Sequence, residues 1–400
     1  SNGLEKRPKL RFPGFDEPWN TALLSDYFVK STKKNSDGMI SNVICNSAKQ
    51  GLIPQREYFD KDIANSDNTN GYYIIESNDF VYNPRKSADA PYGPISSYQY
   101  PEAGIVSPLY LCFRAKREIN PLYFEWYFRS SAWHRYIYMS GDSGARHDRV
   151  SIKDDVFFAM PINVPSAKEQ ERISLFLDAI ERRIETQRTL VETLKKYKRG
   201  LLNKLFSNIN SNIYPTVYLS EVADFLQGLT YSPSDVSVSG YLVLRSSNIQ
   251  NGMLSFDDCV YVDKKVDESL QVKCDDVIMC VRNGSKNLVG KTALIPPNMP
   301  MTTWGAFMMI IRSKLNDTYI FHYLNSQMFF SQVFKDTGTA TINQITKGIL
   351  NECRLPLPPE TERKQISKML SSFDAKIQNA EKCLATLVNL KKALLQQLFI

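Results

Sequence analysis

"VPSAKEQERISLFLDAIERRIETQRTLVETLKKYKRGLLNKLFS" (residues 164–207) returns in altered form as "LPPETERKQISKMLSSFDAKIQNAEKCLATLVNLKKALLQQLFI" (residues 357–400). The two segments align without a gap at an offset of 193 residues, so that Leu177 matches Leu370 and Phe206 matches Phe399. A repeat of this length is the first feature to explain, because it indicates that one structural unit occurs twice.

Both segments have the hydrophobic spacing of a long helix. Apolar residues recur in alternating steps of four and three, the seam of a left-handed coiled coil. Proline stands at the start of each segment (Pro165, and Pro358 with Pro359), just before the predicted helix, and Ser166 with Glu169 adds a capping-box pattern to the first. Helices of about 40 residues are about 60 Å long. The predicted seam consists of Ile173, Leu177, Ile180, Ile184, Val191, Leu194 and Leu201 in the first repeat and Ile366, Leu370, Phe373, Ile377, Leu384, Leu387 and Leu394 in the second.

The two apolar stripes are equivalent, so the simplest way to bury both is for the helices to pair with each other. The alternative is that each helix packs only on its own globular domain. Further apolar residues, among them Phe176, Leu190, Tyr197 and Leu202, lie off the seam and widen the stripe. A wider stripe suggests that helices of another protein dock here.

The regions outside the repeats are also duplicated. Residues 20–163 and 214–356 are of similar length and open and close similarly, but their middles diverge. Both alternate short β-type runs with helical segments such as residues 120–137 and 316–334, which is an α+β pattern. We therefore predict an α+β fold of two domains separated by two long pairing helices. The predicted segments are domain 1 (1–163), a spacer helix (164–208), domain 2 (209–356) and a second spacer helix (357–400).

The composition sets broad limits. A chain of 400 residues with 43% hydrophobic and 23% charged residues is typical of a multi-domain globular protein. No apolar run is long enough to span a membrane. Neither the seven cysteines nor the three histidines have zinc-site spacing, which favours reduced cysteines in a cytoplasmic protein. The net charge of +7 is compatible with a polyanionic partner but does not establish one.

"VRNGSKNLVGKTALIPP" (residues 281–297) looks at first like a phosphate-binding loop. Five residues separate Gly284 from Gly290, one more than that motif has, and a β-branched run ending in Pro296 replaces the required helix. We predict a polar hairpin tip between two strands instead. A methylase is not indicated either, because Asn83-Pro84-Arg85 lacks the second proline and the aromatic ring of an adenine methylase turn.

Several loops combine basic, amide and hydroxyl side chains with aromatic residues. Arginine suits guanine, Asn and Gln suit adenine, and small polar or cationic groups suit phosphates. The same loops could simply be solvated turns. The candidate DNA-binding residues are Arg85, Lys86, Tyr98, Gln99, Arg146, His147 and Arg149 in domain 1, and Arg245, Asn248, Arg282, Asn283, Lys286, Thr341, Asn343 and Gln344 in domain 2.

The whole arrangement resembles the specificity subunit of type I restriction–modification systems. The resemblance is carried by "LRFPGFDEPW" (residues 10–19), "YLVLRSSNIQNG" (241–252), "GTATINQITKGIL" (338–350) and the paired helical repeats. It implies two target-recognition domains that each read half of a split, asymmetric site in double-stranded DNA, held by an antiparallel coil. It also implies as partners two modification (methyltransferase) subunits and the restriction subunits that carry motor and nuclease.

By the same resemblance, the chain itself is non-catalytic and needs no cofactor. Methyl donor, ATP and magnesium would belong to the partner subunits. Two other hypotheses stay open at this point. One is a coiled-coil scaffold that assembles partners without reading bases, and the other is an enzyme with an unrecognised site.

Overall fold

The computed structural model describes residues 7–58, 69–141, 148–207, 213–334 and 344–400. They belong to two compact units: unit 1 is Ser1–Gln187 with Cys383–Ile400, and unit 2 is Arg188–Lys382. Each unit thus combines a globular body with part of both long helices. The finer division into four segments stays a prediction.

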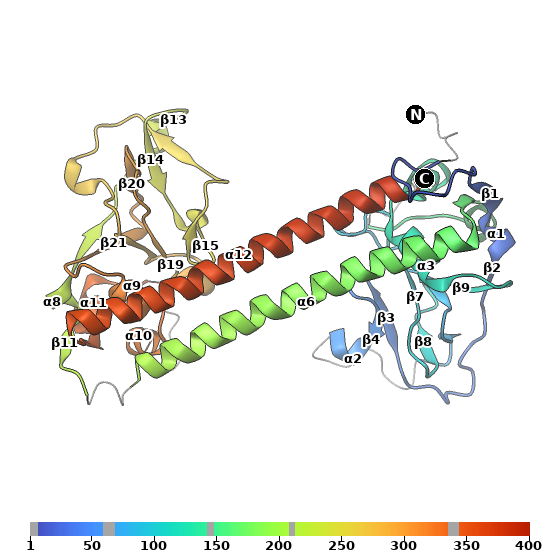
Figure 1. The fold of residues 1–400 in the computed structure, drawn as a ribbon, viewed down its shortest axis with the longest axis horizontal. Helices are drawn as coiled ribbons and strands as arrows, with labels where there is room; N and C mark the ends of the chain where they lie inside the picture. The colour runs from blue at the N-terminus through green and yellow to red at the C-terminus, as the bar shows by residue number, and fades with distance from the viewer. Residues whose placement is uncertain (1–6, 59–68, 142–147, 208–212, 335–343) are drawn as a thin grey trace. The chain divides into compact units, whose positions relative to one another are not determined.

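The long helices are α6 (Ala167–Leu205) and α12 (Glu360–Leu398), green and red in Figure 1. In unit 1, Ile173 and Leu177 from the start of α6 share a hydrophobic core with Leu394 from the end of α12. Beside this core, Lys391 donates a hydrogen bond to Glu181 at 2.6 Å. The start of one helix meets the end of the other, so the two run antiparallel.

Unit 2 repeats this pairing with the two helices exchanged. Leu202 from the end of α6 shares a core with Leu370 from the start of α12. Lys198 pairs with Asp374, and these are the repeat counterparts of the Lys391 and Glu181 pair. Every residue of the predicted seam is buried or half-buried. Pairing of the helices is therefore confirmed within each unit, and the alternative in which they contact only globular domains is wrong.

The start of α6 differs from the predicted capping box in one bond. Ser166 Oγ accepts the N–H of Glu169 at 3.4 Å, as predicted. The buried Glu169 carboxylate instead accepts two hydrogen bonds from Arg11, both at 2.8 Å. A bidentate, charge-assisted pair is stronger than a single bond to a backbone N–H, so Arg11 takes the carboxylate and ties the N-terminal segment to α6.

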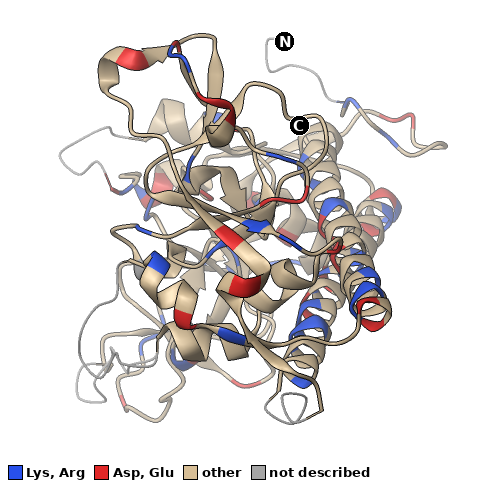
Figure 2. Ribbon diagram, turned by 90° about the vertical axis from the view of Figure 1, so that its left-hand side faces the viewer, with Lys and Arg blue, Asp and Glu red and all other residues tan. Residues whose placement is uncertain are grey.

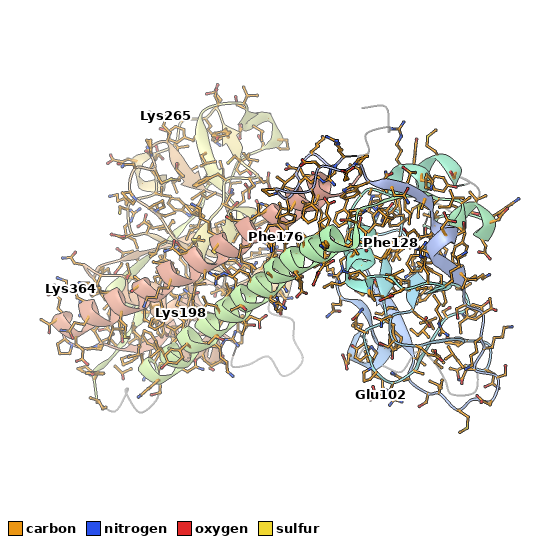
Figure 3. All side chains as sticks on the ribbon, turned by 45° about the vertical axis from the view of Figure 1, so that its right-hand side comes forward. Glu102, Phe128, Phe176, Lys198, Lys265 and Lys364 are labelled. Carbon is orange, nitrogen blue, oxygen red and sulfur yellow. The ribbon has the colours of Figure 1, made fainter. Side chains whose placement is uncertain are left out.

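Unit 1 is built from short strands and helices around an aromatic core that includes Phe128 (Figure 3). Its main sheet has the antiparallel order β2-β9-β6-β7, and further pairs are β1-β10, β3-β4 and β5-β8. Its strands are β1 (Asn20–Leu23), β2 (Phe28–Lys30), β3 (Ile44–Ser47), β4 (Gly51–Pro54), β5 (Tyr73–Ile75), β6 (Phe80–Tyr82), β7 (Ile95–Ser97), β8 (Gly104–Val106), β9 (Leu111–Ala115) and β10 (Pro161–Val164). Its short helices are α1 (Leu24–Tyr27), α2 (Gln55–Tyr58), α3 (Pro121–Arg129), α4 (His134–Ser140) and α5 (Asp154–Phe158).

Unit 2 has a main sheet of the matching antiparallel order β12-β21-β18-β19, a second sheet β13-β17-β14-β20, and the pairs β11-β22 and β15-β16. Its strands are β11 (Thr216–Tyr218), β12 (Ala223–Gln227), β13 (Val236–Ser237), β14 (Tyr241–Leu244), β15 (Ile249–Gln250), β16 (Met253–Leu254), β17 (Val260–Val262), β18 (Val277–Cys280), β19 (Thr292–Leu294), β20 (Thr302–Trp304), β21 (Met308–Ser313) and β22 (Arg354–Pro356). Its helices are α8 (Leu219–Val222), α9 (Tyr319–Leu324), α10 (Gln327–Val333) and α11 (Lys347–Glu352), with 3₁₀ turns η2 (Pro233–Asp235), η3 (Ser246–Asn248), η4 (Glu268–Leu270) and η5 (Lys286–Leu288).

The α+β fold class is confirmed, and so is the hairpin predicted in place of a phosphate loop, because β18 and β19 pair antiparallel across it. The prediction of the helical segments is wrong in one respect. Residues 120–137 and 316–334 each form two helices, not one. Ser130 and Ser326 end α3 and α9 by donating their hydroxyls to the carbonyls of Tyr127 and Tyr323, both at 2.6 Å. Such local side-chain bonds compete with helix continuation.

Each main sheet is stabilised by the same ion pair on matching strands. In unit 1, Arg114 of β9 binds the buried Asp79 at 2.6 and 2.7 Å. In unit 2, Arg312 of β21 binds the buried Asp276 at 2.8 and 2.7 Å. The duplication inferred from the helices therefore extends into the divergent bodies, where the aligned sequences differ almost completely.

Histidine burial predicts a loss of stability in acid. His322 lies on α9 against α12 and is 0% exposed; its Nδ1 has no hydrogen-bond partner in the described structure and lies 4.0 Å from the carboxylate of Asp374. Burial, aided by the charge of Lys198, lowers the pKa of His322 to about 3. A folded-state pKa below the ordinary 6.5 means that the unfolded chain binds the proton more tightly. The contribution of neutral His322 to the free energy of unfolding is fully present above pH 6.5. It is lost as the pH falls from 6.5 toward 3.

We expect His322 to reduce the free energy of unfolding by about 1.4 kcal/mol between pH 7.5 and pH 5.5. Denaturant unfolding of the wild type and His322→Gln across this range measures it, and the variant should be less sensitive to pH. His134→Gln should have a similar effect, because burial lowers the pKa of that histidine in unit 1 to about 4. An unchanged pH dependence in His322→Gln would contradict the prediction.

Candidate nucleic-acid interface

Three segments far apart in the sequence meet in unit 2. The first follows β18, the second precedes α11, and the third is the turn before β21. The N–H of Ile345 donates to the carbonyl of Val281 at 2.7 Å, next to a bridge between Arg282 and Gln344. The N–H groups of Val281 and Arg282 donate to the carbonyl of Phe307 at 3.0 and 3.2 Å. Backbone pairing therefore holds all three segments together.

Unit 1 brings its counterparts together, two of them by the same backbone pairing. The N–H of Val150 donates to the carbonyl of Pro84 at 2.9 Å, beside a bridge between Arg85 and Arg149. The turn before β9, which carries Leu109, borders the same hollow of about 300 Å³ as Pro84 and Val150. We call this surface the three-segment face and define it as residues 84–87, 107–110 and 148–151 in unit 1 and residues 281–285, 305–308 and 344–346 in unit 2.

An arginine occupies the same place on both faces. In unit 1, Arg85 lies six residues after the ion-paired Asp79, just beyond β6. In unit 2, Arg282 lies six residues after the ion-paired Asp276, just beyond β18. Both side chains are exposed. The charge of Arg85 reaches Tyr110, where it partly opposes the burial that raises the pKa of that phenol. In unit 2 the Arg282 guanidinium carbon lies 5.4 Å from the centroid of the Phe307 ring.

The sequence interpretation missed two residues of these faces. Leu109 is 60% exposed and Phe307 is 59% exposed. In the sequence both fall within hydrophobic β-type runs (residues 104–114 and 306–313), where the pattern gives no reason to expect exposure. A local signal exists in hindsight, because Ser107-Pro108 and Gly305 each introduce a turn just before the strand.

Several predicted residues are accessible on the faces or beside them. Lys86 is exposed, and Arg149 is half-buried with its guanidinium 3.8 Å from Asp148. Gln344 is exposed. The Asn283 amide donates to Ser246 at 3.1 Å, which joins the loop of Arg245 to the unit 2 face. In that loop Arg245 pairs with Asp258 at 2.8 Å.

Two predicted DNA contacts are buried and need correction. Tyr98 is 0% exposed, and its hydroxyl donates to the carbonyl of Glu102 at 2.9 Å. Asn248 is 0% exposed, and its amide donates to the carbonyls of Ser255 and Asp258 at 2.9 and 3.0 Å. Both side chains are used to shape loops, so neither is available to touch a base in this structure.

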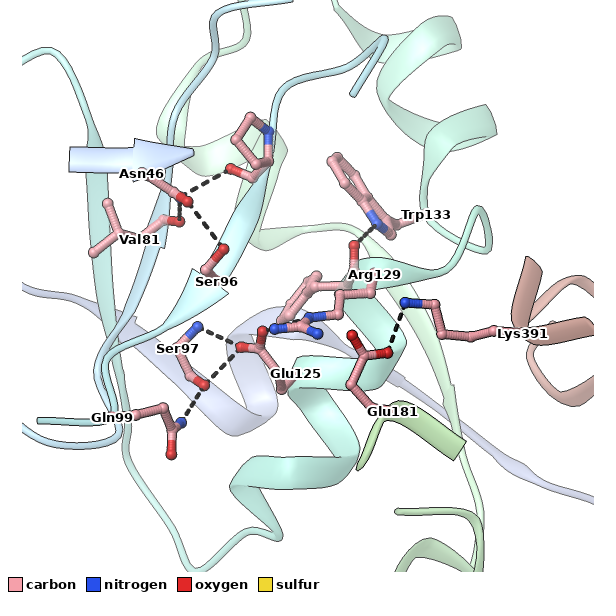
Figure 4. A network of polar contacts seen from close by, with 12 residues as sticks. Asn46, Val81, Ser96, Ser97, Gln99, Glu125, Arg129, Trp133, Glu181 and Lys391 are labelled. Atoms are coloured by element: carbon pink, nitrogen blue, oxygen red, sulfur yellow. Dashed lines mark hydrogen bonds and ion pairs between the residues drawn. The ribbon is translucent and has the colours of Figure 1, made fainter. Parts of the chain in front are cut away.

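Gln99 lies away from the three-segment face. It donates to Ser97 at 2.5 Å, and Ser97 donates to the buried Glu125, which also pairs with Arg129 (Figure 4). These residues line a groove shared with Asp178 and Glu181 of α6. The polar side chains at the end of β7 therefore support the junction with the long helix, and not the candidate interface.

The remaining predicted residues, Arg146, His147, Thr341 and Asn343, lie outside the described residues, as does the side chain of Lys286. Within the described part of the chain no group of three or more His, Cys, Asp or Glu side chains is arranged to hold a metal ion. Among the helices described, none combines the length and apolarity needed to cross a bilayer. All seven cysteines are free thiols.

Residues 214–388 match the family model of the type I restriction modification DNA specificity domain. The chain is 28% identical over 171 residues to the EcoKI specificity subunit of Escherichia coli K12, covering 41% of this chain and 36% of that protein. It is 28% identical over 176 residues to the StySPI specificity subunit of Salmonella potsdam, covering 42% and 38%. The matched segments thus span little more than a third of these relatives.

Solved structures extend the likeness of fold to nearly the whole chain. A chain from a study of complex assembly and conformational transition of the type I R-M system aligns with a TM-score of 0.61 and 18% identity, covering 98% of this chain and 99% of that one. The S subunit of a type I system from M. genitalium aligns with a TM-score of 0.57 and 14% identity, with the same coverage. The chain thus resembles the specificity subunits of type I restriction–modification systems: it contains a type I restriction modification DNA specificity domain over residues 214–388, and nearly its whole length shares the fold of these solved structures.

Proposed function

We propose that this chain is the non-catalytic, DNA-reading subunit of a cytoplasmic type I restriction–modification complex. Each three-segment face would read one half of a bipartite, asymmetric site in double-stranded DNA. The observation that carries the proposal is the pair of exposed arginines, Arg85 and Arg282, held at matching positions by matching backbone bonds. Different side chains on equivalent scaffolds give one duplicated fold the means to read two different half-sites.

The long helices would set the spacing of those half-sites. A helix of 39 residues such as α6 is about 58 Å long. Paired helices preserve length and rotation, whereas a flexible linker of similar length would let the reading units drift by many ångströms. Over much of their length the helices carry Lys and Arg interspersed with Asp and Glu (Figure 2), and only basic charged residues follow Glu192 in α6 and Glu381 in α12.

The outer faces of the helices would dock modification subunits. Phe176, Leu190 and Tyr197 of α6 are 37%, 45% and 64% exposed, although the seam beside them is buried. On α12, Met369 and Leu390 fall at the repeat counterparts of Phe176 and Tyr197 and are also exposed. An outer apolar stripe repeated on both helices fits helices of partner proteins, two of them by the duplication. Restriction subunits would join this core.

Exchange of the unit 2 body tests the proposal. Residues 214–356 are replaced by the equivalent segment of another specificity subunit, both long helices are kept, and the methylated sites are mapped in cells that express the modification subunits. We expect one half-site sequence to change completely. The other half-site and the number of base pairs between the two should not change, because domain 1 and the helices are the same.

Each other outcome has a distinct meaning. An unchanged site would favour the scaffold hypothesis, in which the chain assembles partners without reading bases. A change in both half-sites would contradict independent reading by the two units. The reciprocal exchange of residues 20–163 is the matched control and should alter only the other half-site.

A further inference from the structure

Leu109 and Phe307 form a matched pair of exposed apolar residues. Each stands five residues before the ion-paired arginine of its strand, Arg114 or Arg312. Each sits in the same turn, closed by the N–H of Tyr110 donating to Ser107 at 3.0 Å and by the N–H of Met308 donating to Gly305 at 2.8 Å. The two units have retained an exposed apolar tip although the residues around it differ.

Their surroundings argue against incidental exposure. Isolated apolar residues on a surface need no explanation. These two, however, lie on the three-segment faces beside the exposed arginines, and Phe307 accepts two backbone hydrogen bonds from the segment of Arg282. The Arg282 guanidinium lies 5.4 Å from the Phe307 ring. An arginine fork and an apolar surface are thus presented side by side by two backbone-paired segments of the unit 2 face.

Two groups in the major groove of DNA match this pair of side chains. Guanine offers O6 and N7 to an arginine fork, and thymine offers its C5-methyl group to an apolar side chain. Neighbouring base pairs are stacked about 3.4 Å apart, so side chains that lie in contact can reach adjacent pairs. Resting on the proposed function, we propose that Leu109 and Phe307 each pack on the methyl group of a thymine, one in each half-site, adjacent to the base pair bound by Arg85 or Arg282.

Replacement of thymine by uracil tests this directly, because uracil lacks only the methyl group. The complex of the full chain with its modification subunits is titrated with duplexes that carry the mapped site, in which each thymine of the half-sites is replaced singly by uracil. One thymine in each half-site should be sensitive, with binding weakened about fourfold by loss of one buried methyl group.

The variants assign each sensitivity to its residue. Phe307→Ala should weaken binding at least as much and abolish the uracil effect in the half-site of unit 2 only. Leu109→Ala should do the same in the other half-site. Val238→Ala and Met39→Ala are matched controls, since these side chains are 96% and 81% exposed but lie off the faces, and both should leave the uracil effects intact.

Failure of this inference can be told from failure of the proposed function. The inference is overturned if no thymine is sensitive to uracil, or if Phe307→Ala and Leu109→Ala keep the full uracil effects. If Arg282→Ala still weakens binding in such a case, the faces read DNA and only the methyl contacts are wrong. If none of these substitutions on the faces changes binding, the proposed interface itself is wrong.

Discussion

Arg312→Ala will lower the free energy of unfolding by about 3–5 kcal/mol, because it leaves a buried carboxylate without its partner. The side chain of Asp276 is 2% exposed and accepts two bonds from Arg312, which is itself 23% exposed. Asp276 also accepts the N–H of Lys273 at 2.7 Å, so it cannot easily rotate out to water. Denaturant unfolding at pH 7 measures the loss.

Two further variants show whether the unpaired charge is the cause. Arg312→Met combined with Asp276→Leu removes both charges and should restore most of the lost stability, since apolar replacement of a whole buried pair is often nearly neutral. Arg114→Ala in unit 1 should cost less, because that side chain is 42% exposed and water can reach Asp79 once it is gone. A double variant as unstable as Arg312→Ala would show that packing, and not charge, is responsible.

Arg282→Ala will weaken binding to the cognate DNA site about 30-fold, as expected for loss of a good bidentate contact to a guanine. The effect should depend on one half-site only: a duplex already altered in the unit 2 half-site should bind wild type and variant alike. Arg85→Ala should behave in the same way toward the half-site of unit 1. Equilibrium titrations at fixed salt with the complete methyltransferase complex measure both.

Two further variants distinguish the effect of positive charge on DNA affinity from the effect of base recognition. Arg282→Lys keeps the positive charge but lacks the planar fork, so it should lose most of the affinity that alanine loses. Lys265→Ala (Lys265 is labelled in Figure 3) removes one exposed charge that is not among the residues of the face, and should change affinity only slightly and equally for all sequences. If Arg282→Ala weakens all duplexes equally, Arg282 contacts phosphate and does not read a base.

The parts of the fold that the sequence predicted well are those with long periodic patterns. The seam of α6 and α12 was read from the spacing of residues such as Leu177 and Leu370, and both are 0% exposed. Repetition over about 40 residues makes such a pattern hard to mistake. Shorter signals were less secure: at the break between α3 and α4 the Ser130 hydroxyl donates to the carbonyl of Tyr127, a local bond that hydrophobic pattern does not reveal.

The candidate site was predicted only in part, for a physical reason. Arg85 and Arg282 were predicted from side-chain type, and both lie exposed on the faces; that they contact DNA stays a prediction. Tyr98 and Asn248 were included on side-chain type alone, yet both are buried and bonded to backbone. Residue type does not distinguish a polar side chain that binds a ligand from one that satisfies its own loop, because the same donors and acceptors serve both purposes.

The sequence by itself determined the duplication, the two long helices and the mixed α+β bodies, because periodicity and repetition are properties of the order of residues along the chain. Only the tertiary structure decided which loops meet. The bonds from Val150 to Pro84 and from Ile345 to Val281 join segments more than 60 residues apart. Such pairings depend on how strands are placed in a sheet, and no local pattern records them. For the same reason the exposure of Leu109 and Phe307 could be recognised only once the turns that carry them had been folded onto the faces.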